Sequence, residues 1–251
     1  MELTVLGTSA GWPEAGRANA GFLLQHDGFN LVVDLGTGTL SNLQRSLPHE
    51  RIDAIAISHR HGDHWLDLYP LSIARRFHPE ELPPVDLFAP AGVVERMEAL
   101  GGGDDADAVR RTFAHHEVDP GDGFEAGPFR IATRLMPHLV PDLGMVVTAG
   151  ARTLAYTGDT GPGPEVEALA EGVDLLLAEA SWLDGQGADM APIHLTARQA
   201  ALHAAAAGVP ELVLTHLWPG NDRERARAEA QEEFGGGLTI AEEGLALQIG
   251  A

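Results

Sequence analysis

The sequence predicts an α/β (α+β) fold, and three observations lead to it. Short apolar segments alternate along the chain with longer amphipathic ones, as strands alternate with helices in mixed domains. Hydrophobic residues make up 44% of the 251 positions, enough to bury a full core. No long polar linker divides the chain. We therefore expect one domain that spans residues 1–251.

The first half of the chain opens with three predicted strands. Glu2–Leu6 is the first, and Phe22–Gln25 and Phe29–Asp34 flank Asp27 and Gly28, a dipeptide typical of a hairpin turn. The elements expected after them are a short helix at Leu40–Leu47, a strand at Ile52–Ile57, a helix within Trp65–Phe77, a strand at Val85–Phe88, a helix at Gly92–Leu100 and a flexible glycine-rich crossing at Gly101–Asp107.

The second half repeats this outline, and a polar residue closes each predicted strand. Phe129–Met136 runs into His138, Thr153–Thr157 into Asp159, and Glu211–Thr215 into His216.

One helix of the second half has clear boundaries. Thr196 and Gln199 form a capping box before a helix at Ala197–Ala207, which closes at Gly208. His194 lies two residues before the cap. We therefore expect it in a loop, where its side chain can face a cleft.

Charge and composition exclude several functions. Sixteen basic residues, all Arg, stand against 37 acidic ones, a net charge of −21 that disfavours binding to an extended nucleic acid. Without a long apolar run or a basic N-terminal leader, we expect a cytoplasmic protein that contacts no membrane. There is no cysteine, so disulfides and thiolate chemistry are excluded. Any metal must be bound by His and carboxylate.

The densest chemical signal follows the apolar run Ile52–Ile57. His59, His61, Asp63 and His64 fall within six residues. His59 and His61 can share one metal, whereas Asp63 and His64 can begin a second site of nitrogen and oxygen ligands suited to Zn²⁺ or Mn²⁺. The alternative is a solvated histidine-rich loop, but the spacing favours two metal ions.

The segment His59-Arg-His61-Gly-Asp63-His64 resembles the His-x-His-x-Asp-His signature of the metallo-β-lactamase-fold hydrolases. That resemblance implies a four-layer αββα sandwich, and it matches later ligands of the family to His138, Asp159 and His216. The implied arrangement has His59, His61 and His138 on one ion, Asp63, His64 and His216 on the other, and Asp159 between them. The cofactors expected are therefore two divalent ions, Zn in the first place, with Mn left open.

Around His194, the sequence His-Leu-Thr-Ala resembles ribonuclease Z and its phosphodiesterase relatives. The segments around Trp65, Glu179 and Trp218 are similar to the atypical bacterial cyclic-nucleotide phosphodiesterases. The resemblance implies that His194 protonates the leaving alkoxide, while Asp63 holds the proton of the nucleophile. Glu179 is expected either to orient His194 or to fix the conformation of the surrounding loop.

Together these features predict a dinuclear phosphodiesterase that acts on a small phosphodiester, foremost a cyclic nucleotide. The alternatives are a ribonuclease Z-like tRNA 3′-processing enzyme, a hydrolase of another ester class and a metal-binding sensor without catalysis. We find no basic Gly/Pro-rich arm of the kind that ribonuclease Z uses to grip tRNA. A homodimer is left open.

Other polar residues are predicted to lie outside the ligand set. Asp34, at a strand end, is expected to order a loop, and His78 either faces the cleft or contacts a helix end. Four of the remaining histidines are predicted at the surface: His26, His49, His115 and His116. His203 is predicted either in the core or at the surface.

Overall fold

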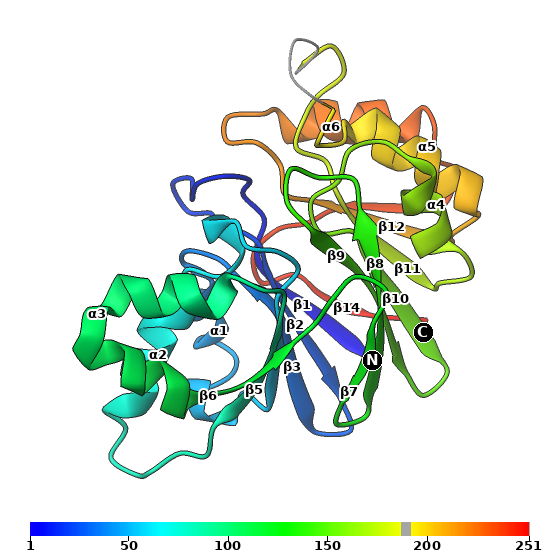
Figure 1. The fold of residues 1–251 in the computed structure, drawn as a ribbon. Coiled ribbons are helices and arrows are strands. Elements are labelled where there is room, and N and C mark those ends of the chain that lie inside the picture. Colours follow the sequence, from blue (N-terminus) through cyan, green and yellow to red (C-terminus); the bar gives the residue numbers. More distant parts are fainter. Residues whose placement is uncertain (187–191, 251) are drawn as a thin grey trace.

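Two seven-stranded sheets face each other at the centre of the molecule (Figure 1). The computed structural model describes residues 1–186 and 192–250, and for residues 103–105 it describes the backbone alone. The first sheet has the order β14-β1-β2-β3-β4-β5-β6, with β1 at Glu2–Gly7, β2 at Gly21–His26, β3 at Phe29–Leu35, β4 at Ala54–Ala56, β5 at Val85–Ala89, β6 at Phe113–Glu117 and β14 at Ala246–Gln248. The second has the order β13-β12-β11-β10-β9-β8-β7, with β7 at Gly123–Ala126, β8 at Phe129–Met136, β9 at Asp142–Ala149, β10 at Arg152–Tyr156, β11 at Leu175–Glu179, β12 at Glu211–Thr215 and β13 at Gly237–Ile240.

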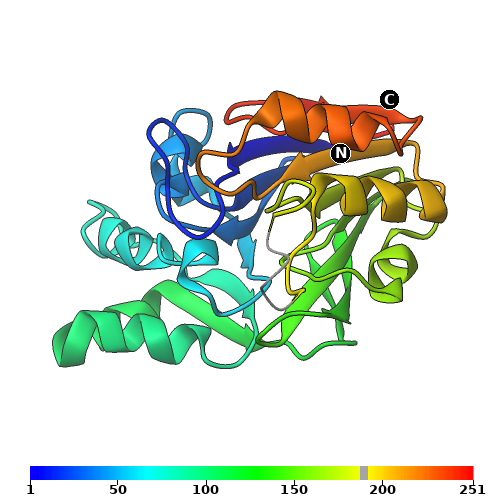
Figure 2. The same cartoon turned by 90° about the horizontal axis from the view of Figure 1, so that it is seen from above.

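Helices cover the outer face of each sheet (Figures 1 and 2). The first sheet is covered by α1 at Thr39–Leu43, α2 at Leu68–Arg76 and α3 at Val93–Thr112, and the second by α4 at Pro164–Ala170, α5 at Ala197–Ala207 and α6 at Arg223–Gln231. The predicted four-layer αββα sandwich is therefore confirmed. Across the described ranges, no helix is long and apolar enough to cross a membrane.

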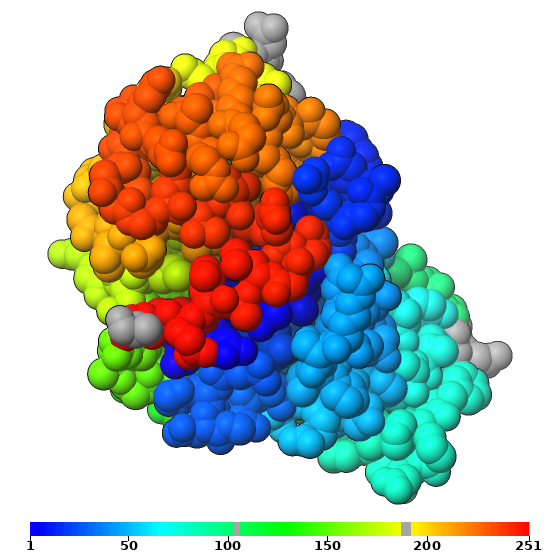
Figure 3. Space-filling model, turned by 180° about the vertical axis from the view of Figure 1, so that it is seen from behind, coloured from blue at the N-terminus to red at the C-terminus, as the bar shows by residue number. Residues whose placement is uncertain are grey.

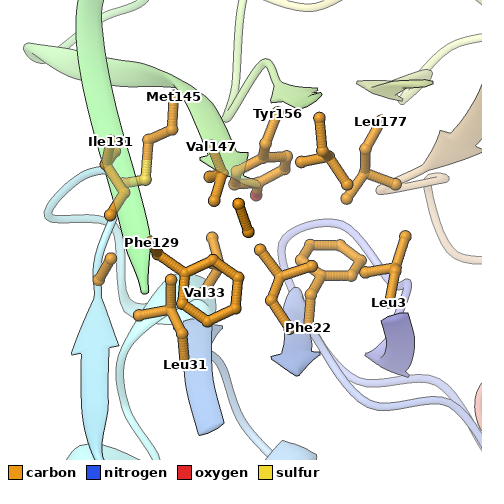
Figure 4. Packing of buried hydrophobic residues seen from close by; sticks show 14 of the residues in the cluster. Leu3, Phe22, Leu31, Val33, Phe129, Ile131, Met145, Val147, Tyr156 and Leu177 are labelled. Atoms are coloured by element: carbon orange, nitrogen blue, oxygen red, sulfur yellow. The ribbon is translucent and has the colours of Figure 1, made fainter. Parts of the chain in front are cut away.

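The inner faces of the two sheets share one hydrophobic core (Figure 4). Phe22 of the first sheet and Tyr156 of the second pack edge to face with ring centroids 5.2 Å apart. Phe129, Met145 and Leu177 are each at most 1% exposed. Full burial of such a side chain is worth roughly 1.5–3 kcal/mol, so this core holds the sheets, and the loops at their ends, in fixed relative positions.

Local signals predicted two features accurately. Asp27 and Gly28 both have positive φ, 48° and 80°, as a type I′ hairpin turn requires. Helix α5 has the predicted bounds, with the capping box of Thr196 and Gln199 formed and Gly208 left-handed at φ 69°.

The predicted flexible crossing at Gly101–Asp107 is wrong. Helix α3 extends to Thr112 and is interrupted only at Gly102, whose φ of 67° and ψ of −173° are not helical. The chain resumes its helix because Ala108 and Val109, 3% and 1% exposed, pack in the core. Tertiary burial outweighs the poor helix propensity of the glycines.

Two other elements are shorter than predicted. The Leu40–Leu47 helix is α1, which ends at Leu43. The Ile52–Ile57 strand is paired only as β4. The helix expected within Trp65–Phe77 is α2, and the chain before it forms a 3₁₀ turn, η2, at Gly62–His64. A second 3₁₀ turn, η1, lies at His49–Arg51.

Parallel pairing places the functional loops on common sheet edges. β3, β4, β5 and β6 run parallel in the first sheet, as do β10, β11, β12 and β13 in the second. Loops that follow the carboxyl ends of parallel strands gather at one edge, where α/β proteins bind their ligands.

Candidate metal centre

The seven predicted ligands meet at one place, although they come from four segments of the chain. They lie in the loop after β4, which holds His59, His61, Asp63 and His64, and directly after β8, β10 and β12, which lead to His138, Asp159 and His216.

The first group consists of His59, His61, His138 and Asp159. His61 Nδ1 lies 3.0 Å from His59 Nε2 and 3.1 Å from His138 Nε2. Asp159 Oδ2 lies 3.6 Å from His59 Nε2 and 3.8 Å from His138 Nε2. All four therefore point one ligand atom at a common centre.

The second group consists of Asp63, His64 and His216. His216 Nε2 lies 3.3 Å from both His64 Nε2 and Asp63 Oδ2. The other oxygen of Asp159, Oδ1, lies 3.3 Å from His64 Nε2. Asp159 thus turns one carboxylate oxygen towards each group.

These spacings fit a metal better than a hydrogen-bond network. Zn–N bonds of about 2.0–2.1 Å place two ligand atoms of a tetrahedron roughly 3.3 Å apart, close to the nitrogen separations of 3.0–3.3 Å. Asp159 Oδ1 is buried and makes no hydrogen bond, a costly state unless a cation satisfies it. The cluster is therefore suited to a metal ion.

Hydrogen bonds outside the cluster hold four of the five imidazoles. Asp142 Oδ2 lies 2.8 Å from His59 Nδ1, and Asp34 Oδ2 lies 2.7 Å from His64 Nδ1. The Ile193 carbonyl lies 3.0 Å from His138 Nδ1, and Ser181 Oγ lies 3.0 Å from His216 Nδ1. An acceptor at Nδ1 fixes the proton there and leaves Nε2 free to bind a metal. His61 instead presents its Nδ1 to the cluster.

Asp34 lies outside the ligand groups, as predicted, but it does more than order a loop. Its buried carboxylate accepts hydrogen bonds from the Ser58 backbone at 2.7 Å and from the Tyr156 hydroxyl at 2.7 Å, besides its contact with His64. Asp34 has a φ of 55°, which is unusual for a residue other than glycine. Its position therefore depends on these partners, and it orients His64.

Burial and charge prepare the cluster to bind a cation. Burial lowers the pKa of His59, His61 and His138, so these rings are neutral and can act as ligands. Burial opposes a charge on His64 too, but neighbouring carboxylates, Asp159 first, raise its pKa well above the ordinary value. Burial also works against the Asp159 carboxylate, yet the surrounding imidazoles, His216 first, hold its pKa well below the ordinary value.

Two glycines let the backbone pass close to the cluster. At Gly158, with φ 60°, a Cβ would collide with the Asp142 carboxylate. At Gly36 a Cβ would collide with the carbonyl oxygen of Asp63. A larger residue at either position would displace a group that borders the centre.

His194 lies beside both ligand groups. Its ring centroid is 5.2 Å from that of His138 and 5.9 Å from that of His216. Its Nδ1 donates to Glu179 Oε1 at 2.8 Å. Burial works against a charge on His194, but the Glu179 carboxylate raises its pKa to about 9. A third grouping of His194 with Asp159 and His216 also has metal-ligand spacing, but Glu179 already occupies Nδ1.

Glu179 combines the two roles that the sequence left as alternatives. Besides His194 it accepts hydrogen bonds from the Thr160 backbone at 2.7 Å and from Ser181 Oγ at 2.7 Å. It therefore fastens the loops after β10 and β11 and orients His194 at the same time.

The other histidines lie away from the centre. His115 and His116 are exposed on β6. His116 Nε2 lies 2.8 Å from Asp86 Oδ1. His78 contacts the Glu80 backbone after α2. The partners of His26, His49 and His203 are Phe129, Glu50 and Glu167, and none of these belongs to the ligand groups.

Sequence reasoning missed Asp142 and Ser181. Asp142 begins β9 and orients His59, and Ser181 Oγ joins Glu179 to His216. The only local signal for Asp142 is a carboxylate at the start of an apolar strand, and Ser181 carries none beyond its place two residues after Glu179.

Comparison with known proteins decides the family. The profile of the β-lactamase superfamily domain matches residues 29–217, three quarters of the chain. The chain belongs to the β-lactamase superfamily. Within it, the chain is similar to the probable metallo-hydrolase YhfI of Bacillus subtilis, with 31% identity over 98% of both chains. The crystal structure of YhfI matches 98% of this chain and 99% of its own with a TM-score of 0.88 and 30% identity.

Two further members show the range of this similarity. Rv1339 of Mycobacterium tuberculosis is 36% identical over 94% of this chain and 88% of its own length. The ribonuclease Z of Salinispora arenicola is 31% identical over 99% of this chain and 96% of its own. That second comparison extends over 306 positions, more than the 251 residues of this chain, whereas the comparison with YhfI extends over 252.

Proposed function

We propose that this superfamily member is a dinuclear metal-dependent phosphodiesterase that hydrolyses a small phosphodiester, foremost a cyclic nucleotide. The hydrolase class is supported by relatives that are named metallo-hydrolase and ribonuclease Z. The observation that carries the phosphodiester assignment is the His194–Glu179 pair, a proton donor held at 2.8 Å beside the ligand cluster.

The proposed metals are two, Zn²⁺ or Mn²⁺. His59, His61 and His138 would hold one, and Asp63, His64 and His216 the other, with Asp159 shared. When bound, the ions would supply positive charge for the phosphoryl oxygens and lower the pKa of a water towards neutrality.

Two side chains then transfer protons: Asp63 accepts one from the water, and His194 donates one to the leaving oxygen. The Asp63 carboxylate, whose Oδ2 accepts the Gly11 backbone N–H at 2.8 Å, is placed to hold a proton of the attacking water on its other oxygen. The water oxygen bonds to phosphorus, the bond from phosphorus to the leaving oxygen breaks, and His194 donates its proton to that oxygen. Glu179 keeps His194 protonated near neutral pH, because it raises the pKa of the ring.

Size and charge favour a small substrate. A cyclic mononucleotide has one negative charge, which a metal centre can neutralise, whereas tRNA exposes many phosphates and needs several basic contacts. This chain has a net charge of −21. The longer comparison with the Salinispora ribonuclease Z indicates that the relative contains inserted residues that this chain lacks.

The second candidate is a ribonuclease Z-like tRNA 3′-processing enzyme. Its support is the 31% identity to the Salinispora ribonuclease Z over nearly the whole chain.

A substrate panel tests the proposal. Protein loaded with Zn²⁺ or Mn²⁺, its metal content measured, is given cyclic AMP, bis(p-nitrophenyl) phosphate, a 3′-extended tRNA, a thioester and a β-lactam. We expect cyclic AMP to be cleaved faster than tRNA at low and moderate salt. The activity should disappear in Asp159→Ala and persist in His116→Ala, which excludes a contaminating enzyme. Efficient tRNA cleavage with a steep salt dependence, and none on cyclic AMP, would establish the second candidate.

A further inference from the structure

Three of the four tryptophans of the chain lie together next to the metal centre. The ring centroids of Trp182 and Trp218 are 4.6 Å apart at an interplanar angle of 33°, and those of Trp12 and Trp218 are 4.9 Å apart at 83°. We call these three residues the tryptophan wall. The fourth, Trp65, is 4% exposed and donates its indole N–H to the Arg60 carbonyl, so it belongs to the core.

Each residue of the wall is a close chain neighbour of a group in the centre. Gly11, before Trp12, donates its backbone N–H to Asp63 Oδ2. Ser181, before Trp182, bonds to Glu179 and His216. Trp218 follows His216 by two residues. The Trp182 ring is 6.3 Å from that of His194, so the wall begins beside the proposed proton donor.

The three segments are joined by backbone hydrogen bonds. The Ala10 N–H donates to the Leu217 carbonyl at 3.1 Å, and the Trp218 N–H donates to the Ser181 carbonyl at 3.2 Å. Ser9 Oγ donates to the Trp12 carbonyl at 2.9 Å. Figure 3 shows the dark blue N-terminal loop against the orange segment that contains residues near 218. These hydrogen bonds hold the three segments of the wall together.

Trp12 presents much of its indole to solvent, with 49% of its surface exposed. Trp182 and Trp218 are partly exposed. Indole rings usually bury most of their surface. An ordered aromatic group that stays open next to a reactive centre offers a surface on which another flat ring can stack.

We propose that the tryptophan wall is a nucleobase-binding subsite, which holds the base of a nucleotide while its phosphodiester lies at the metal centre. The inference rests on the proposed phosphodiesterase function and specifies its substrate as a nucleotide with an aromatic base. Stacking suits this acidic chain because it binds a neutral ring without basic side chains. It also tolerates different bases, since every base has a π-face.

Binding of two product-like ligands to the zinc-loaded protein tests the subsite. Adenosine 5′-monophosphate and ribose 5-phosphate share the sugar and the phosphate, and only the first has a base. By calorimetry we expect the nucleotide to bind on the order of 10-fold more tightly, as one stacked base allows. Trp12→Ala should remove most of this difference and Trp12→Phe should retain most of it. Phe77→Ala, which changes an aromatic residue 72% exposed on α2's far end, should retain all of it.

The outcomes separate the subsite from the function. Equal affinities for the two ligands in the unaltered protein would overturn the subsite, even if phosphodiesters are hydrolysed. An equal loss of affinity for both ligands in Trp12→Ala would also overturn it, because Trp12 would then support the metal centre and would not bind the base. A base preference that depends on Trp12, in a protein that hydrolyses neither cyclic AMP nor bis(p-nitrophenyl) phosphate, would support the subsite and reject the proposed function.

Discussion

At the scale of single residues, the centre depends on the partners behind its imidazoles. Asp142, Asp34 and Ser181 each accept or share a proton at the Nδ1 of one histidine. Such partners fix the tautomer and the direction of the ring, and they make a metal site rigid before the metal binds. His194 has a similar partner in Glu179, but its ring is held at the edge of the ligand groups.

His194→Ala should reduce turnover while the bound metals remain. A positioned acid contributes on the order of 10²- to 10⁴-fold, and we expect a loss in this range for cyclic AMP, whose leaving alkoxide needs a proton. The loss should be much smaller for bis(p-nitrophenyl) phosphate, because p-nitrophenolate leaves without one. The control is His203→Ala, a partly exposed histidine on α5. An equal loss on both substrates would show that His194 positions the substrate.

Asp159→Ala should deplete both metals, because each of its oxygens faces a different ligand group. Elemental analysis after gel filtration measures the metal content per chain. His116→Ala, which removes an exposed contact between His116 and Asp86, should leave the metal content unchanged. Full metal occupancy in the Asp159 variant would refute the ligand assignment.

The His194–Glu179 pair also predicts a pH dependence for the metal-free protein. The folded-state pKa of His194, about 9, lies above its ordinary value of 6.5. The pair's contribution to stability is therefore fully present below pH 6.5 and is lost as the pH rises towards 9. Glu179→Gln should lower the titration midpoint of His194, measured by NMR, while Asp86→Asn should not. The stability difference between the unaltered protein and Glu179→Gln should shrink over this window, and a midpoint that stays the same would contradict the assignment.

At the scale of elements, short loops after strands and before helices carry the site. β4, β10, β11 and β12 end in Ala56, Tyr156, Glu179 and Thr215, each close to a functional residue. Helix α5 has another role, because its capping box ends the loop that holds His194. Thr196 accepts the Gln199 backbone N–H, and Gln199 in turn accepts the Thr196 backbone N–H at 2.9 Å.

Thr196→Ala should therefore destabilise the protein by about 1 kcal/mol, the usual value of a lost N-cap. Chemical denaturation of the metal-loaded protein measures the free energy of unfolding. Ser41→Ala, at an exposed position of α1, is the control and should change it little. An unchanged stability in Thr196→Ala would mean that the cap is replaced by water.

At the scale of the whole molecule, the ligand groups join the two sheets. His59, His61, Asp63 and His64 come from the first sheet, and His138, Asp159 and His216 come from the second. A metal bound between them connects both halves of the sandwich in the folded state and not in the unfolded chain. Its binding free energy is then added to the stability of the fold.

Removal of the metals with a chelator should lower the melting temperature. At a free metal concentration of 100 times Kd, binding contributes about 2.7 kcal/mol, which corresponds to roughly 5–10 °C for a domain of this size. Scanning fluorimetry with EDTA, followed by Zn²⁺ addition, measures the shift and its reversal. Asp159→Ala should show a much smaller shift. The same melting temperature with and without EDTA would contradict a metal that joins the sheets.

The sequence by itself determined the features that depend on chain neighbours. Alternation of apolar residues predicted the strands, Asp27 and Gly28 predicted the hairpin, and the Thr196 capping box predicted the limits of α5. The loop from His59 to His64 showed its metal-ligand character for the same reason, since its chemistry is concentrated in six consecutive residues. The more distant ligands and the layer order came from a family resemblance.

Only the tertiary structure decided which distant groups meet. Asp142 reaches His59, and Asp34 meets Tyr156, because the two sheets pack face to face and the start of β9 lies against the loop after β4. Helix α3 continues past its glycines because the core receives Ala108 and Val109. Trp12 joins Trp182 and Trp218 through contacts between loops far apart in the sequence. Such contacts follow from sheet pairing and packing, which leave no periodic pattern in the local sequence.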